Sequence, residues 1–268
     1  MVRTPHSREA ALYIHLANSE SDQLLIDSEQ MARQIFPFIQ RNFRDLTGHG
    51  IVHSTSIISY LNLFISILKA EGLELSRTEV RLLYSAAWLH DIGYLTCSER
   101  SEHSRESCRL LQIIEENYSL LGDLKNSMMY LVKYHQSRYD LSEVPKNAVH
   151  IHGDQVRLQF LCALFRLADA CHIGEDRANR LVYYLIEGEI NPESKPHWIG
   201  NSSVLSVDFI VEDAKILITV TNENDAKVLT DGFIKDFQKL MPFLAPAFPF
   251  YSVEIQSETP FELEGGRI

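Results

Sequence analysis

Apolar residues recur three and four positions apart from about residue 20 to residue 190, which is the spacing of one buried face of an α-helix. The pattern predicts helices over residues 22–46, 53–70, 77–91, 102–117, 121–136, 154–173 and 177–187. Pro37 should bend the first of them. Ser76 and Glu79 have the spacing of a capping box, so the start of the third is well marked.

The pattern changes after Asn191 and Pro192. Residues 202–211 and 214–221 alternate between apolar and polar positions, as strands with one buried face do, and the residues between them predict a tight turn. An amphipathic helix over 225–242 and a strand over 251–256 follow. The sequence therefore predicts a mainly α fold. It consists of an N-terminal extension (1–19), a helical bundle (20–190) and a small C-terminal α+β lobe of β-β-α-β order (191–268).

Composition narrows the class of protein. With 45% hydrophobic residues among 268, the chain can bury a substantial core. It has 36 acidic and 25 basic residues, and the formal charge of −11 disfavours a protein that coats nucleic acid. A small phosphorylated substrate in a local basic pocket remains compatible with that charge. No two cysteines form a C-x-x-C pair and no apolar run reaches about 18 residues, so we expect a cytoplasmic protein without membrane association.

Histidines and aspartates mark different predicted helices. His53 lies near the start of one helix, His90 and Asp91 end another, and Asp169 lies within the apolar stretch FLCALFRLADACHI. A buried carboxylate needs a counter-charge, hydrogen bonds or a metal, and Arg166, one turn earlier, is one available partner for Asp169. Such a pair would not explain the whole set. Imidazole and carboxylate groups from separate helices indicate a divalent metal site.

The order of these residues resembles the H…HD…D pattern of the HD-domain metal-dependent phosphohydrolases. HGIVHSTSIISYL is similar to the helix of the first histidine, AAWLHDIGY to the namesake motif, and LFRLADACHI to the helix of the last aspartate. The resemblance covers residues 45–180 and implies a helical bundle with His53, His90, Asp91 and Asp169 as metal ligands. Because HG-x-x-H, EH-S and RLADA precede an α+β tail, the chain is most similar to the HD-CE type, a bacterial subgroup associated with effector domains.

A further likeness, to the two-metal branch of the superfamily, implies a second metal. SEHSRESCRLL places His103 where that branch has its next histidine, and LVKYHQSRYD supplies His135, with Gln136 where a second histidine is usual. With Asp91 as a bridge, one or two divalent ions are expected, from Mn, Fe, Mg, Co or Ni. SRYDLSEVP stands in place of the GYP element of cyclic-dinucleotide phosphodiesterases, which disfavours that substrate.

The resemblance also implies which side chains serve the reaction. Metal-activated water would attack phosphorus, with Asp91 at the metal and cations stabilising the phosphoryl group. The expected cations are Lys133, Arg166 and Arg177. We expect His49, Gln136, His172 and Arg180 to support the ligands or contact the substrate.

Each of the cations also has a structural interpretation. Arg166 can pair with Asp169 or Asp176, whereas the others can lie on solvated helix faces. Four aromatic residues near the motifs are expected to pack rather than to bind: Trp88, Tyr94, Tyr134 and Tyr139. His150 and His152 have metal-like spacing but lie in a polar connection, and we expect them to lie outside the site.

Two functions remain open. The first is a metal-dependent phosphohydrolase that cleaves a phosphate ester of a nucleotide-like substrate. The alternative is a catalytically weak HD module that binds a nucleotide as a sensor or assembly subunit, since the second metal set is one imidazole short. The partner of either is a small phosphorylated molecule, and a second copy of the chain or an effector protein is a further partner to consider. A nuclease fits the chemistry but fits poorly with the charge of −11.

Overall fold

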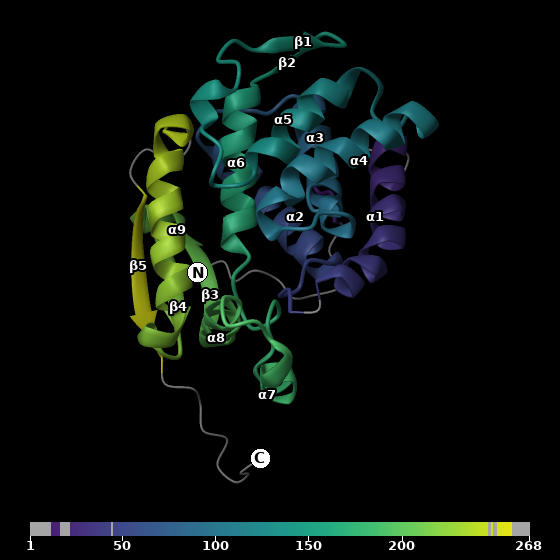
Figure 1. Ribbon diagram of the computed structural model, residues 1–268. Coiled ribbons are helices and arrows are strands. Elements are labelled where there is room, and N and C mark those ends of the chain that lie inside the picture. Colours follow the sequence, from purple (N-terminus) through teal and green to yellow (C-terminus); the bar gives the residue numbers. More distant parts are fainter. Residues whose placement is uncertain (1–11, 17–21, 44, 246–247, 249–250, 259–268) are drawn as a thin grey trace.

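The computed structural model describes residues 12–16, 22–43, 45–245, 248 and 251–258. Its helical part consists of α1 (Gln23–Asn42), α2 (Ile51–Ala70), α3 (Arg77–Leu89), α4 (His103–Tyr118), α5 (Lys125–Tyr134) and α6 (Leu158–Cys171). These helices pack around one buried apolar cluster (Figure 1). The prediction of a mainly α fold is confirmed.

The helix α2 lies at the centre of the helical part. It contacts α1, α3 and α6, and its Ile57, Ile58, Leu61 and Phe64 are fully buried. Among the described helices it alone is long and apolar enough to cross a membrane, but 56% of its apolar window is buried inside this fold. The core therefore accounts for its apolar sequence, and its first turn carries His53 into the interior.

The helix α3 is fixed at both ends. At its start, Ser76 and Glu79 form the capping box that their spacing predicts, and the buried Glu79 carboxylate also accepts a hydrogen bond from the guanidinium of Arg157 at 2.7 Å. Beyond its end the chain tightens into a 3₁₀ turn, Ile92–Leu95. Gly93 in that turn lies against α4, where its amide donates to Ser107 Oγ at 2.8 Å. The end of α3 and the start of α4 are thereby held together.

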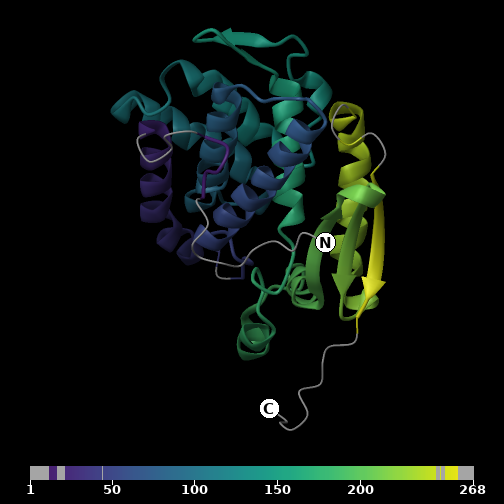
Figure 2. The same cartoon turned by 180° about the vertical axis from the view of Figure 1, so that it is seen from behind.

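The C-terminal part is α+β. The strands β3 (Val204–Ile210) and β4 (Lys215–Val220) pair antiparallel, α9 (Glu223–Leu244) follows, and β5 (Ser252–Ser257) pairs parallel with β4. Figure 2 shows the three strands side by side. The helix α9 contacts α6 as well as β4 and β5, so this part shares the core cluster of the helices. The β-β-α-β order is confirmed, whereas the division at residue 191 stays a prediction.

Several predicted boundaries are wrong. Residues 149–156 form a hairpin, β1 (Val149–Ile151) and β2 (Asp154–Val156), which turns at His152 and Gly153, both at positive φ, so the following helix begins at 158 rather than 154. The next helix, α7 (Arg180–Ile186), begins three residues later than predicted because the side chain of Asn179 caps it. The sequence pattern did not predict α8 (Lys195–Ser203), since its Gly, Asn and Ser residues form no apolar stripe.

The predicted extension, residues 1–19, lies outside the described residues except for 12–16. Within those five residues, the Tyr13 hydroxyl accepts from Trp88 Nε1 at 2.8 Å and donates to Glu29 at 2.9 Å, so they contact both α1 and α3. At the start of α1, Asp22 makes no capping hydrogen bond and pairs instead with Arg81 of α3 at 2.8 Å. This ion pair ties the two helices together.

The contact at Gly93 predicts a large effect of one methyl group. A Cβ on Gly93 would overlap the backbone of His103 and Ser107, which cannot move without displacing α4. We expect Gly93→Ala to lower the free energy of unfolding by about 3 kcal/mol in a chemical denaturation curve. The matched control is Gly188→Ala, where nothing lies within 4 Å, and it should change stability by less than about 1 kcal/mol. Equal stability of the two variants would contradict the close packing.

Candidate metal centre

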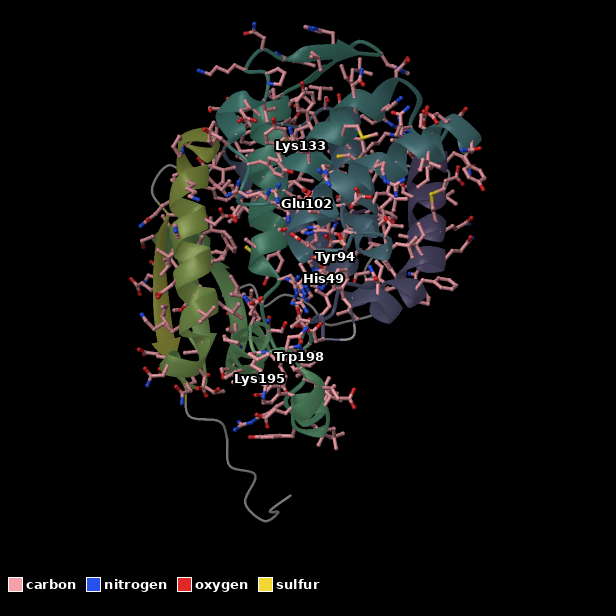
Figure 3. All side chains as sticks on the ribbon, in the orientation of Figure 1. His49, Tyr94, Glu102, Lys133, Lys195 and Trp198 are labelled. Atoms are coloured by element: carbon pink, nitrogen blue, oxygen red, sulfur yellow. The ribbon has the colours of Figure 1, made fainter. Side chains whose placement is uncertain are left out.

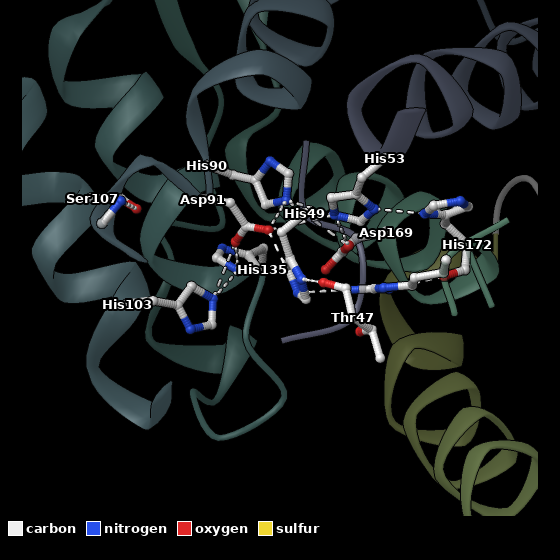
Figure 4. A network of polar contacts seen from close by, with 12 residues as sticks. Thr47, His49, His53, His90, Asp91, His103, Ser107, His135, Asp169 and His172 are labelled. Atoms are coloured by element: carbon white, nitrogen blue, oxygen red, sulfur yellow. Dashed lines mark hydrogen bonds and ion pairs between the residues drawn. The ribbon is translucent and has the colours of Figure 1, made fainter. Parts of the chain in front are cut away.

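Five helices bring imidazoles and carboxylates to one place (Figure 4). His53 comes from the first turn of α2 and Asp169 from the last turn of α6. His90 and Asp91 follow α3, His103 begins α4 and His135 follows α5. All four of these histidines and Asp91 are buried. The structure thus brings together every residue that the sequence analysis expected to bind metal.

The first donor group surrounds the Nε2 atom of His53. This atom lies 3.2 Å from Asp169 Oδ1, 3.2 Å from His90 Nε2 and 3.5 Å from Asp91 Oδ2. His90 Nε2 lies 3.2 Å from the same Asp91 oxygen. Two imidazole nitrogens and two carboxylate oxygens therefore converge on one small volume.

The second donor group lies on the other oxygen of Asp91. His103 Nε2 lies 3.3 Å and His135 Nε2 3.6 Å from Asp91 Oδ1, and the two nitrogens are 2.8 Å apart. One carboxylate thus has one oxygen in each donor group. This is the arrangement that allows a carboxylate to bridge two divalent ions.

The opposite ring nitrogens fix the tautomers of three of the histidines. The Nδ1–H groups donate to backbone carbonyls: His90 to Ala86 at 3.2 Å, His135 to Val132 at 2.7 Å and His103 to Arg100 at 2.6 Å. In the neutral form of each ring, Nε2 therefore carries a lone pair that points toward the donor groups. Facing lone pairs only 2.8 Å apart repel one another unless a cation or proton lies with them, so the donor set fits a metal.

His53 is held by a side chain rather than by the backbone. Its Nδ1 lies 2.7 Å from Nδ1 of His172, whose Nε2 lies 3.2 Å from Asp176 Oδ2. Burial lowers the pKa of His172 to about 4, so this ring is neutral and donates its single proton to Asp176. The Nδ1–H of His53 then donates to His172, and the Nε2 lone pair of His53 faces the cluster. His172 supports a ligand, which is the role expected from the sequence.

Charge and burial set the protonation of the donors. Burial would lower the pKa of His90, but the Asp91 carboxylate beside it raises that pKa. Burial alone would raise the pKa of Asp91, but the imidazoles of His90 and His53 outweigh it and hold that pKa well below its usual range. Against the same effect of burial, His53 lowers the pKa of Asp169. Burial lowers the pKa of His135 to about 3 and also lowers that of His103. At neutral pH the carboxylates are ionised and these two imidazoles are neutral.

A cavity of about 220 Å³ opens onto both donor groups. Its walls include Asp91, Asp169, His103 and His135 of the cluster. The remaining walls are His49, Tyr94, Gln136, Ser137, Arg166, Ala170, Arg177 and Asp236. A reactant in this cavity can therefore touch the metal donors and a small number of polar side chains at once.

The comparisons with known proteins agree with this geometry. The model of a family described as HD-CE matches residues 43–245, well over half of the chain. The chain belongs to the HD-CE family. No curated protein and no solved structure matches it. HD-type domains are commonly metal-dependent hydrolases. In this HD-CE protein, the groups His53, His90 and Asp169, and His90, Asp91 and His135, are compatible with a bound divalent ion.

Two arginines line the cavity, Arg166 and Arg177. Of these two, Arg177 has no carboxylate partner within the described residues. It donates to His49 Nε2 and to the His172 carbonyl, both at 2.8 Å, and its Nε is buried without a hydrogen-bond partner. His49 uses its other nitrogen to donate to the Thr47 carbonyl. His49 therefore positions Arg177 with both of its ring nitrogens and lies beside the donor groups.

The ion-pair partner of Arg166 differs from the one expected from the sequence. It pairs with neither Asp169 nor Asp176, because Asp236 of α9 lies closer: Nε donates to that carboxylate at 2.9 Å and a second nitrogen donates to it as well. The remaining nitrogen donates to the Tyr139 carbonyl at 3.2 Å. The charge of Arg166 is thus neutralised, and the side chain joins α6 to α9 at the wall of the cavity.

Two other basic residues that were expected to serve the substrate, Lys133 and Arg180, do not line the cavity. Lys133 lies over the rings of Tyr134 and Tyr139, 4.8 and 5.1 Å from their centroids, and in Figure 3 it lies apart from His49 and Tyr94. Arg180, which was expected to support the ligands or contact the substrate, is exposed, hydrogen-bonds Tyr184 at 3.3 Å and lies outside the cavity walls. The start of α7 at residue 180 explains the difference, because residue 177 precedes the helix.

Other side chains border the second donor group. Gln136, in the place of the missing histidine, accepts from Ser104 Oγ at 2.6 Å and lies 3.0 Å from His103 Nδ1. Tyr94, which was expected only to pack, stacks on His103 at a centroid distance of 4.2 Å and also lines the cavity. Its place four residues after His90 was the available signal. His150 and His152 lie outside the cavity walls, and His152 pairs with Asp123.

The shared carboxylate predicts how metal content responds to mutation. We expect the purified protein, loaded with Mn²⁺ and desalted, to retain about two ions per chain. His135→Ala should retain roughly one ion, because only the second donor group is broken. Asp91→Ala should lose both, because both groups share this residue. Elemental analysis by mass spectrometry measures the ratio.

The matched control for this measurement is His150→Ala, which removes an exposed imidazole of the hairpin and should leave the metal content unchanged. Circular dichroism checks that each variant is folded. A wild-type protein that retains no ion, or a His135→Ala protein that retains as much as the wild type, would contradict the two-group arrangement.

Proposed function

We propose that this HD-CE protein is a metal-dependent phosphohydrolase that cleaves a phosphate ester of a nucleotide-like substrate. One observation carries the proposal. A cavity of about 220 Å³ has the two donor groups that meet at Asp91 on one side and the unpaired guanidinium of Arg177 on the other. A phosphoryl group satisfies both sides, since it offers oxygens to a metal and negative charge to an arginine.

The donor residues would hold the ions, and the other residues would handle the substrate. When bound, a divalent metal polarises a phosphoryl oxygen and lowers the pKa of a water molecule. Arg177 lines the cavity, and the fork geometry of a guanidinium matches a phosphoryl oxygen. In the overall step the water oxygen bonds to phosphorus, the ester P–O bond breaks, and the departing oxygen takes a proton from solvent.

The charge distribution supports a small anionic substrate over a polymer. The chain as a whole carries −11, so a long nucleic acid would be repelled by most of the surface. The positive charge that attracts the substrate is local. It comes from Arg177 and from the ions that the donor groups would hold. Such a site attracts one phosphate group at short range and is screened from the rest of the surface.

A second candidate function is a nucleotide-binding module with little catalysis. One observation favours it: Gln136 stands where a further imidazole would complete the second donor group, and its carbonyl oxygen is engaged by Ser104. An incomplete group binds its metal more weakly than a complete one. Such a module would bind the nucleotide and release no phosphate.

Hydrolysis and binding are separated by one assay. We expect the wild-type protein with Mn²⁺ to release phosphate or nucleoside from at least one member of a nucleotide panel. Arg177→Ala should lower kcat/KM about 100-fold, because it removes a donor to the phosphoryl oxygen, and Arg177→Lys should recover part of that loss. Arg180→Ala, an exposed arginine three residues away, is the control and should leave kcat/KM within about twofold.

The alternative predicts a different pattern. Tight binding of a nucleotide with no turnover in Mn²⁺, Mg²⁺, Co²⁺ or Ni²⁺ would favour the binding module over the hydrolase. Equal losses of kcat/KM in Arg177→Ala and Arg180→Ala would show that the position of Arg177 in the cavity does not explain its effect. This result would contradict the role given to Arg177.

A further inference from the structure

A second cavity of about 370 Å³ adjoins the metal cavity and shares Ser137 and Arg166 with it as walls. The segment after α5 forms one side, with Arg138 and Tyr139, and α9 forms the other. We propose that this second cavity binds the organic part of the substrate, and that it selects a nucleoside carrying a further phosphate group. This inference rests on the proposed function, because it takes the reacting phosphoryl group to lie in the metal cavity.

The apolar wall of the second cavity is provided by Phe243. Its ring is partly buried against the core and has no aromatic partner within the described part of the chain. Leu141 and Leu240, both buried, lie in the same wall. The other aromatic side chain there, Tyr139, already has Lys133 and Arg138 over its ring, at 5.1 and 5.0 Å from the centroid. Phe243 is therefore the ring that a planar base can pack against.

Two charged walls of the second cavity have no ion pair among the described residues: the cation Lys239, and the carboxylate of Asp140, which accepts a hydrogen bond from the Ser142 amide at 2.9 Å. Arg138 pairs with Glu102 at 3.1 Å and donates to the Ser101 carbonyl at 2.7 Å, and Arg166 pairs with Asp236. Lys239 has no ion pair with a carboxylate of the described residues and is exposed at the rim. A flexible ammonium group at this place suits an anion more than it suits a neutral ring substituent.

These three features together define a substrate class. The phosphoryl group to be cleaved lies at the donor groups, a planar base packs on Phe243, and a second phosphate reaches Lys239. A small aliphatic phosphate would leave the second cavity empty, and a nucleoside monophosphate would leave Lys239 without an anion. Both residues belong to α9, so the C-terminal lobe sets the specificity of a centre built by the helical part.

Calorimetric binding to the Mn²⁺-loaded protein tests the assignment with three probes: inorganic phosphate, adenosine 5′-monophosphate and adenosine 3′,5′-bisphosphate. We expect the wild-type protein to bind the monophosphate roughly tenfold more tightly than phosphate, and the bisphosphate several-fold more tightly again. Phe243→Ala should remove most of the first gain and Lys239→Ala most of the second. Neither should change the affinity for inorganic phosphate.

Two further variants control for a loss of packing and for effects that arise outside the two cavities. Phe243→Leu preserves the apolar bulk that Phe243→Ala removes, and it should still lose most of the gain from the base. Arg180→Ala, outside both cavities, should behave as wild type in all three titrations. Binding of phosphate with undiminished gains in the α9 variants would overturn the subsite alone. A wild-type protein that binds no phosphate and hydrolyses no ester would overturn both the subsite and the proposed function.

Discussion

The carboxylate of Asp91 is buried between four imidazole rings. The rest of the centre depends on the groups that compensate for the free-energy cost of burying this charge. An ionised carboxylate loses much of its hydration in such a place and needs close positive charge or donors in return. His103 and His135, whose Nε2 atoms lie within 3.6 Å of Oδ1, donate their Nδ1 protons to backbone carbonyls and have lowered pKa values, so they offer this oxygen no hydrogen bond. Divalent cations on either side of Asp91 would satisfy the carboxylate and the nitrogens together.

The surrounding fold makes the arrangement rigid. Three of the four histidines donate their Nδ1 proton to a carbonyl three or four residues earlier in the chain, so the local backbone orients each ring. The fourth, His53, depends on His172 and Asp176. Gly93 allows the start of α4 to come close enough for His103 to reach the oxygen of Asp91 that faces away from His53. Small, local features of sequence thus position groups that lie far apart along the chain.

Much of this could be predicted from the sequence because the signals are local. Apolar periodicity gave the helices, and imidazoles and carboxylates at their ends gave the candidate donors. The predictions that failed have two kinds of cause, contacts between distant segments and local features that apolar periodicity does not report. Arg166 lies one turn from Asp169, yet it pairs with Asp236, 70 residues later, since only the packing of α9 on α6 brings the two together. Arg177 and Arg180 have the same spacing as neighbours on one helix face, and only the cap at Asn179 separates them. The α8 helix has no apolar stripe to reveal it.

The central claim is that Asp91 lies between two metal ions, and anomalous diffraction from crystals soaked in Mn²⁺ tests it most directly. The account predicts two anomalous peaks about 3.5–4 Å apart. One peak would be bounded by His53, His90 and Asp169, the other by His103 and His135, with one oxygen of Asp91 on each. A single peak with His103 and His135 unliganded would contradict the second position, and an absence of peaks at Asp91 would contradict the account as a whole.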